Sequence, residues 1–314
     1  MVALLFLMNK PIAVLDLGTN TFHLLIAELN EDLSINEIFV EKKHVKLGEG
    51  GITEGKITEA AFSRGLQAMQ DFKRVIDQYN ITEIYGTGTA ALRTAANGQD
   101  FVDQVKALTG IGIEIINGDQ EASLIYRGVS QAVDIRGNAV IMDIGGGSVE
   151  FIFCDDRSVQ FKKSYPIGAA RLMALFHKSD PINADDIFSL HKHLEEQLAD
   201  LKKNLLIYKP ETLIGSAGAF ETFADLAIRK FGLADRTGES GYSIERTQLQ
   251  SVIGDIILST HDERAADDKI SPVRVDMIVS AAVLTSYILA HADVKSVMLS
   301  TYALKEGLLY EKLV

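Results

Sequence analysis

The residues best suited to chemistry in this sequence run from Asp143 to Ser148 and read Asp-Ile-Gly-Gly-Gly-Ser. Successive glycines permit positive φ angles and can aim several backbone N–H groups into one concavity, which binds phosphate oxygens. A carboxylate beside that concavity suits Mg²⁺, because Mg²⁺ prefers oxygen ligands. No Gly-Lys-Ser/Thr follows, so the segment is not a Walker loop. We therefore take Asp143 as a candidate metal ligand and predict phosphate binding by Gly145, Gly146, Gly147 and Ser148.

A tight hairpin that merely needs glycine is the structural alternative for this segment. Three glycines in a row exceed what a type I′ hairpin requires, and Asp143 directly follows the apolar run 139–142. A carboxylate buried there without a cation or a hydrogen-bond donor would cost free energy. Glu150 lies two residues beyond Ser148, on the same face of the strand expected at 149–154, so it can also face the phosphate or the metal.

A second Asp-x-Gly segment begins at Asp16 and continues through Gly18, Thr19 and Asn20. By itself this turn is a weak signal, although it adds hydroxyl and amide donors in the same geometry. As a repeat of the first segment, it predicts a phosphate held between two domains, with Asp16 and Asp143 as the acidic residue from each. Ligand pockets form preferentially at domain interfaces, which agrees with this interpretation.

Two charged residues outside the turns are further candidates. Arg93 follows a strand that ends in small residues, so its guanidinium can reach a phosphate at the edge of the site; a surface salt bridge is the alternative. Glu121 lies in the first turn of a helix that opens after Asn117 and Gly118. There it either caps the helix or projects as a general base, and the residues alone leave both roles open.

The segment Gly215, Ser216, Ala217 and Gly218 follows a short expected strand and opens a helix. A turn of small residues at a helix N-terminus can accept an anion or allow a ribose to approach, and a tight packing turn explains it equally well. Arg274 is a second cationic candidate, with solvent exposure as its alternative. We keep Gly215, Ser216, Gly218 and Arg274 as weaker candidates for substrate binding.

Strand and helix patterns alternate along the chain, and the alternation restarts once. The first half is expected to contain strands at 12–15, 22–28, 37–45, 84–87 and 113–116 and helices at 58–79, 99–108 and from 119. The second half is expected to contain strands at 139–142, 149–154, 212–215 and 296–299 and helices at 184–204, 219–231, 246–260, 274–290 and from 304. The repeated strand, turn, strand unit predicts two duplicated α/β domains, 1–124 and 125–302, with the closing helix at about 303–314 able to pack back on the first.

The composition limits the possible binding partners and the possible roles of cysteine. The 314 residues are 47% hydrophobic and 24% charged, as expected of a soluble globular protein long enough for two domains. The net charge of −12 argues against nucleic acid and membrane surfaces, which reward clustered Lys and Arg. The single cysteine, Cys154, excludes an internal disulfide and a Cys-based zinc site, and its apolar neighbours predict a core position.

The apolar opening segment, Met1 to Met8, lacks the basic flank and the cleavage site of a secretory signal and is too short to span a bilayer. It is interpreted as an extended first strand, or as a start placed too early with Met8 as the initiator. The expected localisation is cytoplasmic.

Taken together, the motifs resemble the exopolyphosphatase and guanosine pentaphosphate phosphohydrolase family, in the family's order over nearly the whole chain. The matching segments are 16–21, 47–51, 87–93, 117–122, 143–148 with Glu150, and 305–308. The resemblance implies the α/β fold of acetate and sugar kinases, heat-shock proteins and actin. It therefore implies two duplicated actin-like (ribonuclease H-like) domains that flank a cleft.

The resemblance also implies an activity and a role for each candidate. The activity is the Mg²⁺-dependent release of terminal phosphate from polyphosphate or from a guanosine penta- or tetraphosphate. Glu121 would be the general base that activates water, and Asp143 and Glu150 would help to hold Mg²⁺. The turn at 145–148 would cradle the scissile phosphates, and the first domain would complete the pocket with Asp16, Thr19, Asn20 and Arg93.

Departures from the family pattern and two alternative functions remain open. His23 and Lys305 stand where relatives often have Arg, and the chain stops soon after Leu309, without the helical C-terminal domain of long relatives. The length of the substrate therefore stays open. A kinase or ATPase of the same fold, with 215–218 on the adenosine side, is one alternative, and a non-catalytic sensor that binds an alarmone is the other. Homodimerisation is a possibility that only the family provides.

Overall fold

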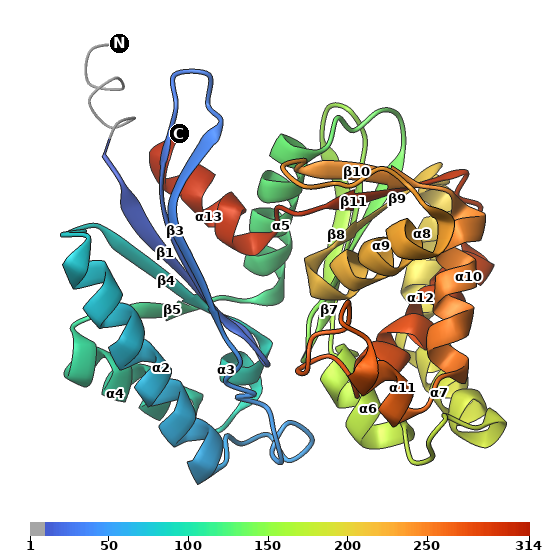
Figure 1. Cartoon of the computed structure of the whole chain (residues 1–314), viewed down its shortest axis with the longest axis horizontal. Helices are drawn as coiled ribbons and strands as arrows, with labels where there is room; N and C mark the ends of the chain where they lie inside the picture. Colours follow the sequence, from blue (N-terminus) through green and yellow to red (C-terminus); the bar gives the residue numbers. More distant parts are fainter. Residues whose placement is uncertain (1–9) are drawn as a thin grey trace. The chain divides into compact units, whose positions relative to one another are not determined.

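The computed structural model describes residues 10–314, so the interpretations of Met1 to Met8 lie outside the described residues. The described chain divides into two compact units (Figure 1). The first ends at Gly128 and is completed by Leu304–Val314, and the second is Val129–Ala303. The sequence placed these boundaries at 124 and 302, close to the observed ones. Helix α5 (Gly118–Ala132) carries the chain across the first boundary.

The first unit is built on a five-stranded sheet. Its strands are ordered β3 (Ile35–Lys43), β2 (Phe22–Leu29), β1 (Ile12–Leu17), β4 (Ile84–Gly88) and β5 (Ile113–Ile115). Strands β1, β2 and β3 form an antiparallel meander, and β4 and β5 continue parallel to β1. Alternate residues of β1, namely Ala13, Leu15 and Leu17, join the core formed with α2 (Glu59–Gln78) and α4 (Gly98–Thr109). Because side chains alternate along a strand, Asp16 lies on the opposite face.

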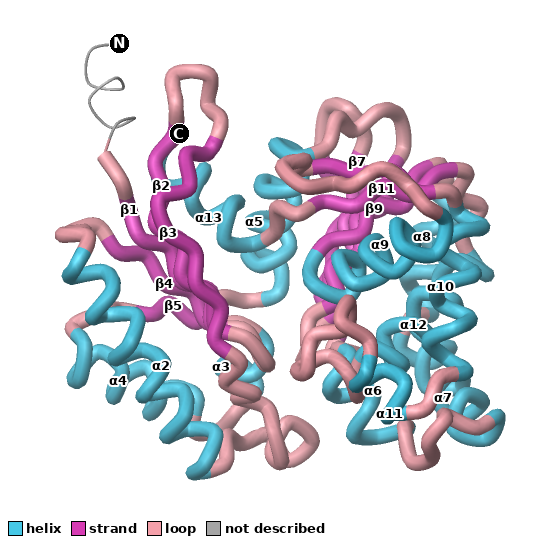
Figure 2. Tube along the Cα trace, viewed as in Figure 1, coloured by secondary structure: helices cyan, strands magenta, loops and turns pink. Residues whose placement is uncertain are grey.

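The second unit repeats this sheet. Its strands are ordered β8 (Val159–Tyr165), β7 (Val149–Cys154), β6 (Ala139–Ile144), β9 (Thr212–Ser216) and β11 (Ser296–Ser300), with β10 (Gly241–Ile244) added antiparallel at the edge. The order and the directions of the first five strands match those of the first unit. Figure 2 draws the strands of both sheets in magenta. The predicted α/β fold of two duplicated actin-like domains is confirmed, whereas the cleft between them stays a prediction.

Three predicted helices of the second unit differ from the observed ranges, and α6 (Ala169–Phe176) and α11 (His261–Ala266) were not predicted. The other helices of this unit are α7 (Ala184–Gln197), α8 (Ala199–Tyr208), α9 (Ala217–Phe231), α10 (Arg246–Leu258) and α12 (Ile278–His291). The helix predicted at 184–204 breaks at Leu198, and the one predicted from Arg274 begins only at Ile278, after a run of turns. The predicted helix 246–260 ends earlier because Thr260 and Glu263 form a capping box that starts α11.

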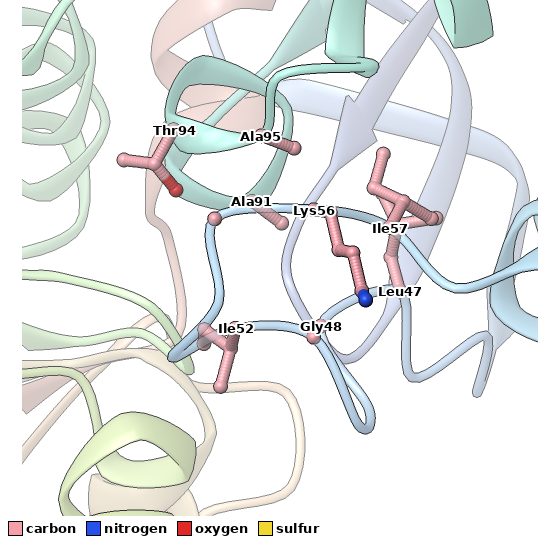
Figure 3. A pocket seen from close by; sticks show the side chains of 10 residues that line it. Leu47, Gly48, Ile52, Lys56, Ile57, Ala91, Thr94 and Ala95 are labelled. Carbon is pink, nitrogen blue, oxygen red and sulfur yellow. The ribbon is translucent and has the colours of Figure 1, made fainter.

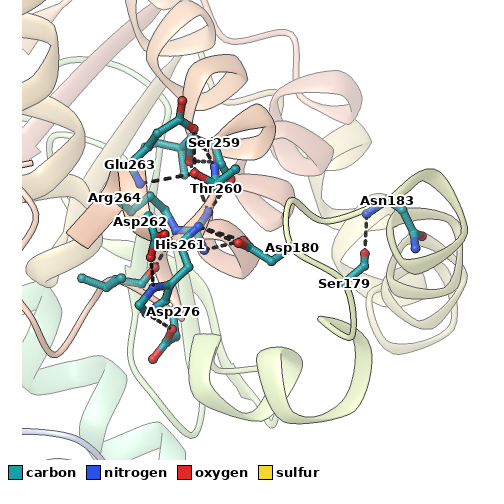
Figure 4. A network of polar contacts seen from close by, with 12 residues as sticks. Ser179, Asp180, Asn183, Ser259, Thr260, His261, Asp262, Glu263, Arg264 and Asp276 are labelled. Carbon is teal, nitrogen blue, oxygen red and sulfur yellow. Dashed lines mark hydrogen bonds and ion pairs between the residues drawn. The ribbon is translucent and has the colours of Figure 1, made fainter. Parts of the chain in front are cut away.

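A buried arginine connects α11 to two neighbouring segments of the second unit (Figure 4). Arg264 is 2% exposed; its Nε donates to the Val275 carbonyl at 2.7 Å, and Nη2 donates to Asp180 at 3.2 Å. Asp180 also accepts from the backbone N–H of His261 at 2.8 Å. Burial of a guanidinium is tolerated here because its charge has a carboxylate partner and its donors have acceptors.

Helix α13 (Leu304–Leu313) packs on β1 and β2 of the first unit and closely approaches α5. A Cβ atom at Gly307 would lie 1.8 Å from the Leu124 carbonyl oxygen, so only glycine allows this approach. The Tyr310 hydroxyl donates to the Leu33 carbonyl at 3.0 Å, which fixes the outer end of the helix. Among the described residues, no helix has both the length and the apolar character needed to cross a membrane.

Two glycines inside helices provide a matched test of this packing. Gly307→Ala should lower the free energy of unfolding by about 1–3 kcal/mol, because the added methyl group overlaps α5. Gly254→Ala in α10 has open space around the new Cβ and should raise it by about 0.5–1 kcal/mol through helix propensity. Urea denaturation of both variants checks the pair. Equal stability of Gly307→Ala and the unmodified chain would contradict the close packing of α13.

Candidate functional site

The turn between β6 and β7 is held by the segment that starts α6. The N–H of Gly145 donates to the Ser148 carbonyl at 3.0 Å. The carbonyls of the three glycines of the turn all accept from consecutive residues of the α6 segment. The donors are Ala169 to Gly145 at 2.9 Å, Ala170 to Gly146 at 3.0 Å and Gly168 to Gly147 at 3.3 Å. The N–H groups at the start of α6 thus donate hydrogen bonds to this loop.

These bonds fix the direction of the next N–H groups. In a trans peptide the C=O and the N–H of one unit point to opposite sides. The peptide units that begin at the three glycines direct their carbonyls at α6, so the N–H groups of Gly146, Gly147 and Ser148 point away from it. Within residues 10–314, no backbone or side-chain acceptor receives these three donors. Three neighbouring N–H donors are the basis of an anion site.

The backbone of the glycine turn differs from the predicted one. Positive φ angles in the glycine turn were expected, and this expectation is wrong. Among the described residues the positive-φ glycines are Gly50, Gly55, Gly110, Gly137, Gly232 and Gly238. Close approach requires a glycine at position 168 instead, since a Cβ atom at Gly168 would lie 2.4 Å from the Gly146 carbonyl oxygen and from the Gly147 nitrogen. Gly168 was not identified from the sequence.

Two buried carboxylates lie beside this turn. Asp143 and Glu150 are directly opposite each other on β6 and β7, so their side chains share one face of the sheet. Asp143 is 7% exposed and Glu150 is 1% exposed. Ser164 of β8, another residue that sequence reasoning missed, donates its hydroxyl to Glu150 at 2.6 Å. Like charges placed opposite each other destabilise a sheet unless a cation or a donor offsets them.

The donor set is of the kind that Mg²⁺ uses. Mg²⁺ is commonly bound by one or two carboxylates together with phosphate oxygens, and Asp143 and Glu150 supply two oxygen ligands next to the N–H donors. Within the described part of the chain, no group of three or more His, Cys, Asp or Glu side chains is arranged as a complete metal cage. The residues therefore fit a metal that shares its coordination with a phosphate.

The first unit repeats the turn with a loop in place of the helix. The Gly18 N–H donates to the Thr21 carbonyl at 3.1 Å. The carbonyls of Thr19 and Asn20 accept from Gly48 at 3.0 Å and from Lys46 at 2.8 Å. By the same peptide geometry, the N–H groups of Asn20 and Thr21 point away from the 46–48 loop.

Cross-strand neighbours also correspond between the two units. Asp16 lies opposite His23 and Thr87, as Asp143 lies opposite Glu150 and Ser216. His23 therefore occupies the position that corresponds to Glu150. The predicted equivalence of the two Asp-x-Gly turns holds at the level of strand register.

A small pocket lies between the 47–57 loop and α3 (Ala90–Thr94) in the first unit (Figure 3). It contains about 200 Å³ of space, including its mouth, and its lining is mostly apolar. The lining residues are Leu47, Gly48, Gly51, Ile52, Gly55, Lys56, Ile57, Ala91, Thr94 and Ala95. The Lys56 ammonium pairs with Glu54 at 2.7 Å. The pocket therefore offers little that would bind phosphate.

Glu121 pairs with Arg93 rather than capping its helix. The Arg93 guanidinium donates to the Glu121 carboxylate at 2.7 Å and to the Ile116 carbonyl at 3.0 Å. The cap of α5 is a reciprocal pair of bonds between Asn117 and Gln120, each 2.9 Å long. The capping alternative for Glu121 is therefore wrong, and so is the surface salt bridge proposed as an alternative for Arg93, because Glu121 is 6% exposed.

Burial sets the protonation behaviour of Glu121. Removal from water raises its pKa above the ordinary 4.5, and the nearby Arg93 guanidinium, which lowers the pKa, offsets only part of the effect. A carboxylate with a raised pKa is a better proton acceptor than an ordinary one. This is the property of a general base.

The 215–218 turn packs tightly. Ala217 adopts a φ of 65°, and a Cβ atom at Gly218 would lie 1.7 Å from an Arg274 terminal nitrogen. Arg274 also donates to the Thr222 hydroxyl at 3.1 Å and contacts Glu221 at 3.4 Å. Full solvent exposure of Arg274 is therefore wrong, and close packing against its guanidinium explains Gly218. Ser216 is fully buried, and its hydroxyl lies 3.4 Å from the Tyr302 carbonyl.

These features belong to a known class of phosphatase. Residues 25–314 match the Ppx/GppA phosphatase family, and the chain belongs to that family. The match covers both units and all the candidate residues except those of the turn at 16–20.

Particular relatives are similar over nearly the whole chain. The crystal structure of an exopolyphosphatase from Cytophaga hutchinsonii superposes with a TM-score of 0.93 at 37% identity, covering 97% of this chain and 98% of that one. Exopolyphosphatase 1 of Mycobacterium leprae is 26% identical over 96% of this chain and 89% of its own length. A guanosine-5'-triphosphate,3'-diphosphate pyrophosphatase of Aeromonas salmonicida is 24% identical, and the match spans 59% of that protein.

The close contact at Gly168 predicts a local effect on anion binding. Gly168 has a φ of −61°, which alanine adopts readily, so Gly168→Ala acts only through the added methyl group. We expect the glycine turn to be displaced and the affinity for inorganic phosphate to fall about tenfold or more, as for the loss of a good hydrogen bond to an anion. Titration calorimetry measures this. Gly254→Ala, which has open space around the new Cβ atom and no positive φ angle, is the control, and equal losses in both variants would contradict the account.

The raised pKa of Glu121 predicts how stability depends on pH and how the carboxyl group titrates without Arg93. Because the folded chain binds the Glu121 proton more tightly than the unfolded chain does, this group's contribution to stability is lost as the pH rises through its folded pKa. Arg93→Met removes the cation that lowers the pKa, so the pKa should rise further. A ¹³C NMR titration of the carboxyl group tests this, with Arg74→Met on the exposed face of α2 as the control. A fall in the pKa in Arg93→Met would contradict the pairing.

Proposed function

We propose that this chain is a Mg²⁺-dependent phosphoanhydride hydrolase that releases terminal phosphate from polyphosphate. The observation that carries the proposal is Glu121. It is a buried carboxylate with a raised pKa, its helix is capped by other residues, and it is held in place by Arg93. Burial of a carboxylate in this way costs stability, and a catalytic base is a reason to retain it.

Each candidate has a role in this proposal. Glu121 accepts a proton from the attacking water, and Arg93 positions its carboxylate. The N–H groups of the 145–148 turn bind phosphate oxygens, supported by the corresponding turn at Gly18, Thr19 and Asn20. Asp143 and Glu150, with Asp16, would hold Mg²⁺, which supplies charge neutralisation on the phosphate when bound.

Polyphosphate is the first choice of substrate because a relative named exopolyphosphatase is more similar in sequence. The exopolyphosphatase of Cytophaga hutchinsonii is 37% identical to this chain, whereas the pyrophosphatase of Aeromonas salmonicida is 24% identical. Guanosine pentaphosphate is the competing substrate that the assay must include.

The kinase and sensor alternatives are less well supported. A kinase needs an open turn for the adenosine side, and the proposed turn at 215–218 is packed against Arg274. A sensor needs no general base, and Glu121 would then be a buried carboxylate retained without a task. Homodimerisation stays a prediction.

The variant Glu121→Gln tests the proposal directly. We expect phosphate release from polyphosphate with Mg²⁺ to fall by about a hundredfold or more in kcat, the usual contribution of a general base. Glu59→Gln is the matched control, since Glu59 also lies in the first turn of a helix but is exposed. A phosphate-release assay on short polyphosphate, long polyphosphate and guanosine pentaphosphate measures both variants. Unchanged turnover in Glu121→Gln removes the base from its role.

A further inference from the structure

Arg171 lies against the glycine turn without a carboxylate partner. Its backbone N–H donates to the Gly146 carbonyl at 3.2 Å, and its side-chain Nε lies 3.5 Å from the Gly147 carbonyl. No carboxylate of residues 10–314 forms an ion pair with it, and none of those residues accepts from its two terminal NH₂ groups. Burial lowers the pKa of the guanidinium, and no acidic neighbour opposes that effect.

Arg171 differs from the other arginines of its unit that are at least partly buried, because their guanidinium groups have acceptors. Arg246 donates to the carbonyls of Leu289 and Val294, and the others pair with carboxylates. The paired residues and their carboxylates are Arg229 with Asp267, Arg236 with Asp225, Arg264 with Asp180 and Arg274 with Glu221. The chain carries 43 acidic and 31 basic residues, so carboxylates are not scarce. A half-buried cation without a counter-ion is unfavourable. An anion from outside the chain would relieve that cost.

A purely structural role does not account for the guanidinium. The contact with Gly147 is long for a hydrogen bond and uses one of the five N–H donors of an arginine. A shorter apolar side chain at this position of α6 would pack against the glycine turn at lower cost. The remaining four donors need acceptors, and the described residues supply none.

We propose that Arg171 binds a phosphoryl group of the polyphosphate chain at the flank of the 145–148 turn. The inference rests on the proposed function for the class of substrate. The planar guanidinium donates two parallel N–H bonds to phosphate oxygens and supplies a positive charge. Arg171 lies on the α6 side of the turn, whereas the backbone N–H groups point away from α6. Two donor sets on different sides of the turn suit successive phosphates of a chain better than a single anion.

The test measures binding apart from turnover. In a Glu121→Gln background with Mg²⁺, calorimetry gives the affinity for tripolyphosphate of the variants Arg171→Gln, Arg171→Lys and Arg136→Gln. Arg136 is an exposed arginine of the same unit, so its variant controls for the lost charge. We expect Arg171→Gln to lose about tenfold to a hundredfold in affinity, as for one charge-assisted hydrogen bond. Arg171→Lys should recover part of the loss, and Arg136→Gln should lose little.

Steady-state kinetics of the variants in chains that retain Glu121 separate this inference from the proposed function. We expect Arg171→Gln to raise KM for tripolyphosphate more than it lowers kcat, with an unchanged melting temperature. Equal affinities in Arg171→Gln and Arg136→Gln overturn the inference, whether or not the chain is a hydrolase. Binding that depends on Arg171 in a chain that hydrolyses none of the substrates supports the inference and overturns the proposed function. A lowered melting temperature with full recovery of affinity at lower temperature also overturns the inference.

Discussion

The candidate site depends on three hydrogen bonds from the start of α6 to the carbonyls of three glycines. Because peptide units are planar and trans, a carbonyl that is bonded on one side forces the next N–H to the other side. The bonds from residues 168–170 therefore prepare three N–H donors before any ligand arrives. Preorganised donors cost little to use, which is the property that electrostatic stabilisation of a phosphate requires. The roles proposed for the buried carboxylates of β6 and β7 and for Arg171 depend on this turn.

The two units reach the same peptide orientation by different means. In the second unit the donors come from the first turn of a helix, and in the first unit they come from the loop at Lys46 and Gly48. The strand register around each aspartate is nevertheless the same. The duplication thus preserves the position of the turn in the sheet, while the support behind it has changed. The first unit adds the pairing of Arg93 with Glu121, for which the second unit has no described counterpart.

The sequence was sufficient for features that depend on neighbouring residues. Apolar periodicity predicted β6 and β7, the glycine run predicted the turn, and Glu121 was placed in the first turn of its helix. Strand β8 was missed because its Val-Gln-Phe-Lys-Lys-Ser-Tyr pattern is only partly buried and lacks a continuous apolar run. Helix α6 was missed because it is short, and with it the donors that orient the glycine turn.

Features that depend on distant residues could not be predicted. The partner of Glu121 lies 28 residues away, and its raised pKa arises from burial, which a single sequence does not display. The prediction of positive φ angles in the glycine turn was wrong for a similar reason. The turn is packed against Gly168, a residue distant in the sequence. The absence of a carboxylate beside Arg171 likewise becomes visible only when all neighbours are in place. The family resemblance, by contrast, predicted the actin-like fold and gave a role to candidate residues that the motifs had already indicated.

The most direct measurement is the chemical shift of three backbone amides during a titration with tripolyphosphate and Mg²⁺ in the Glu121→Gln variant. The account predicts that the N–H resonances of Gly146, Gly147 and Ser148 move downfield together and saturate at one ligand concentration, because these donors point away from α6. Saturable shifts confined to other residues, with these three amides unmoved, would contradict it.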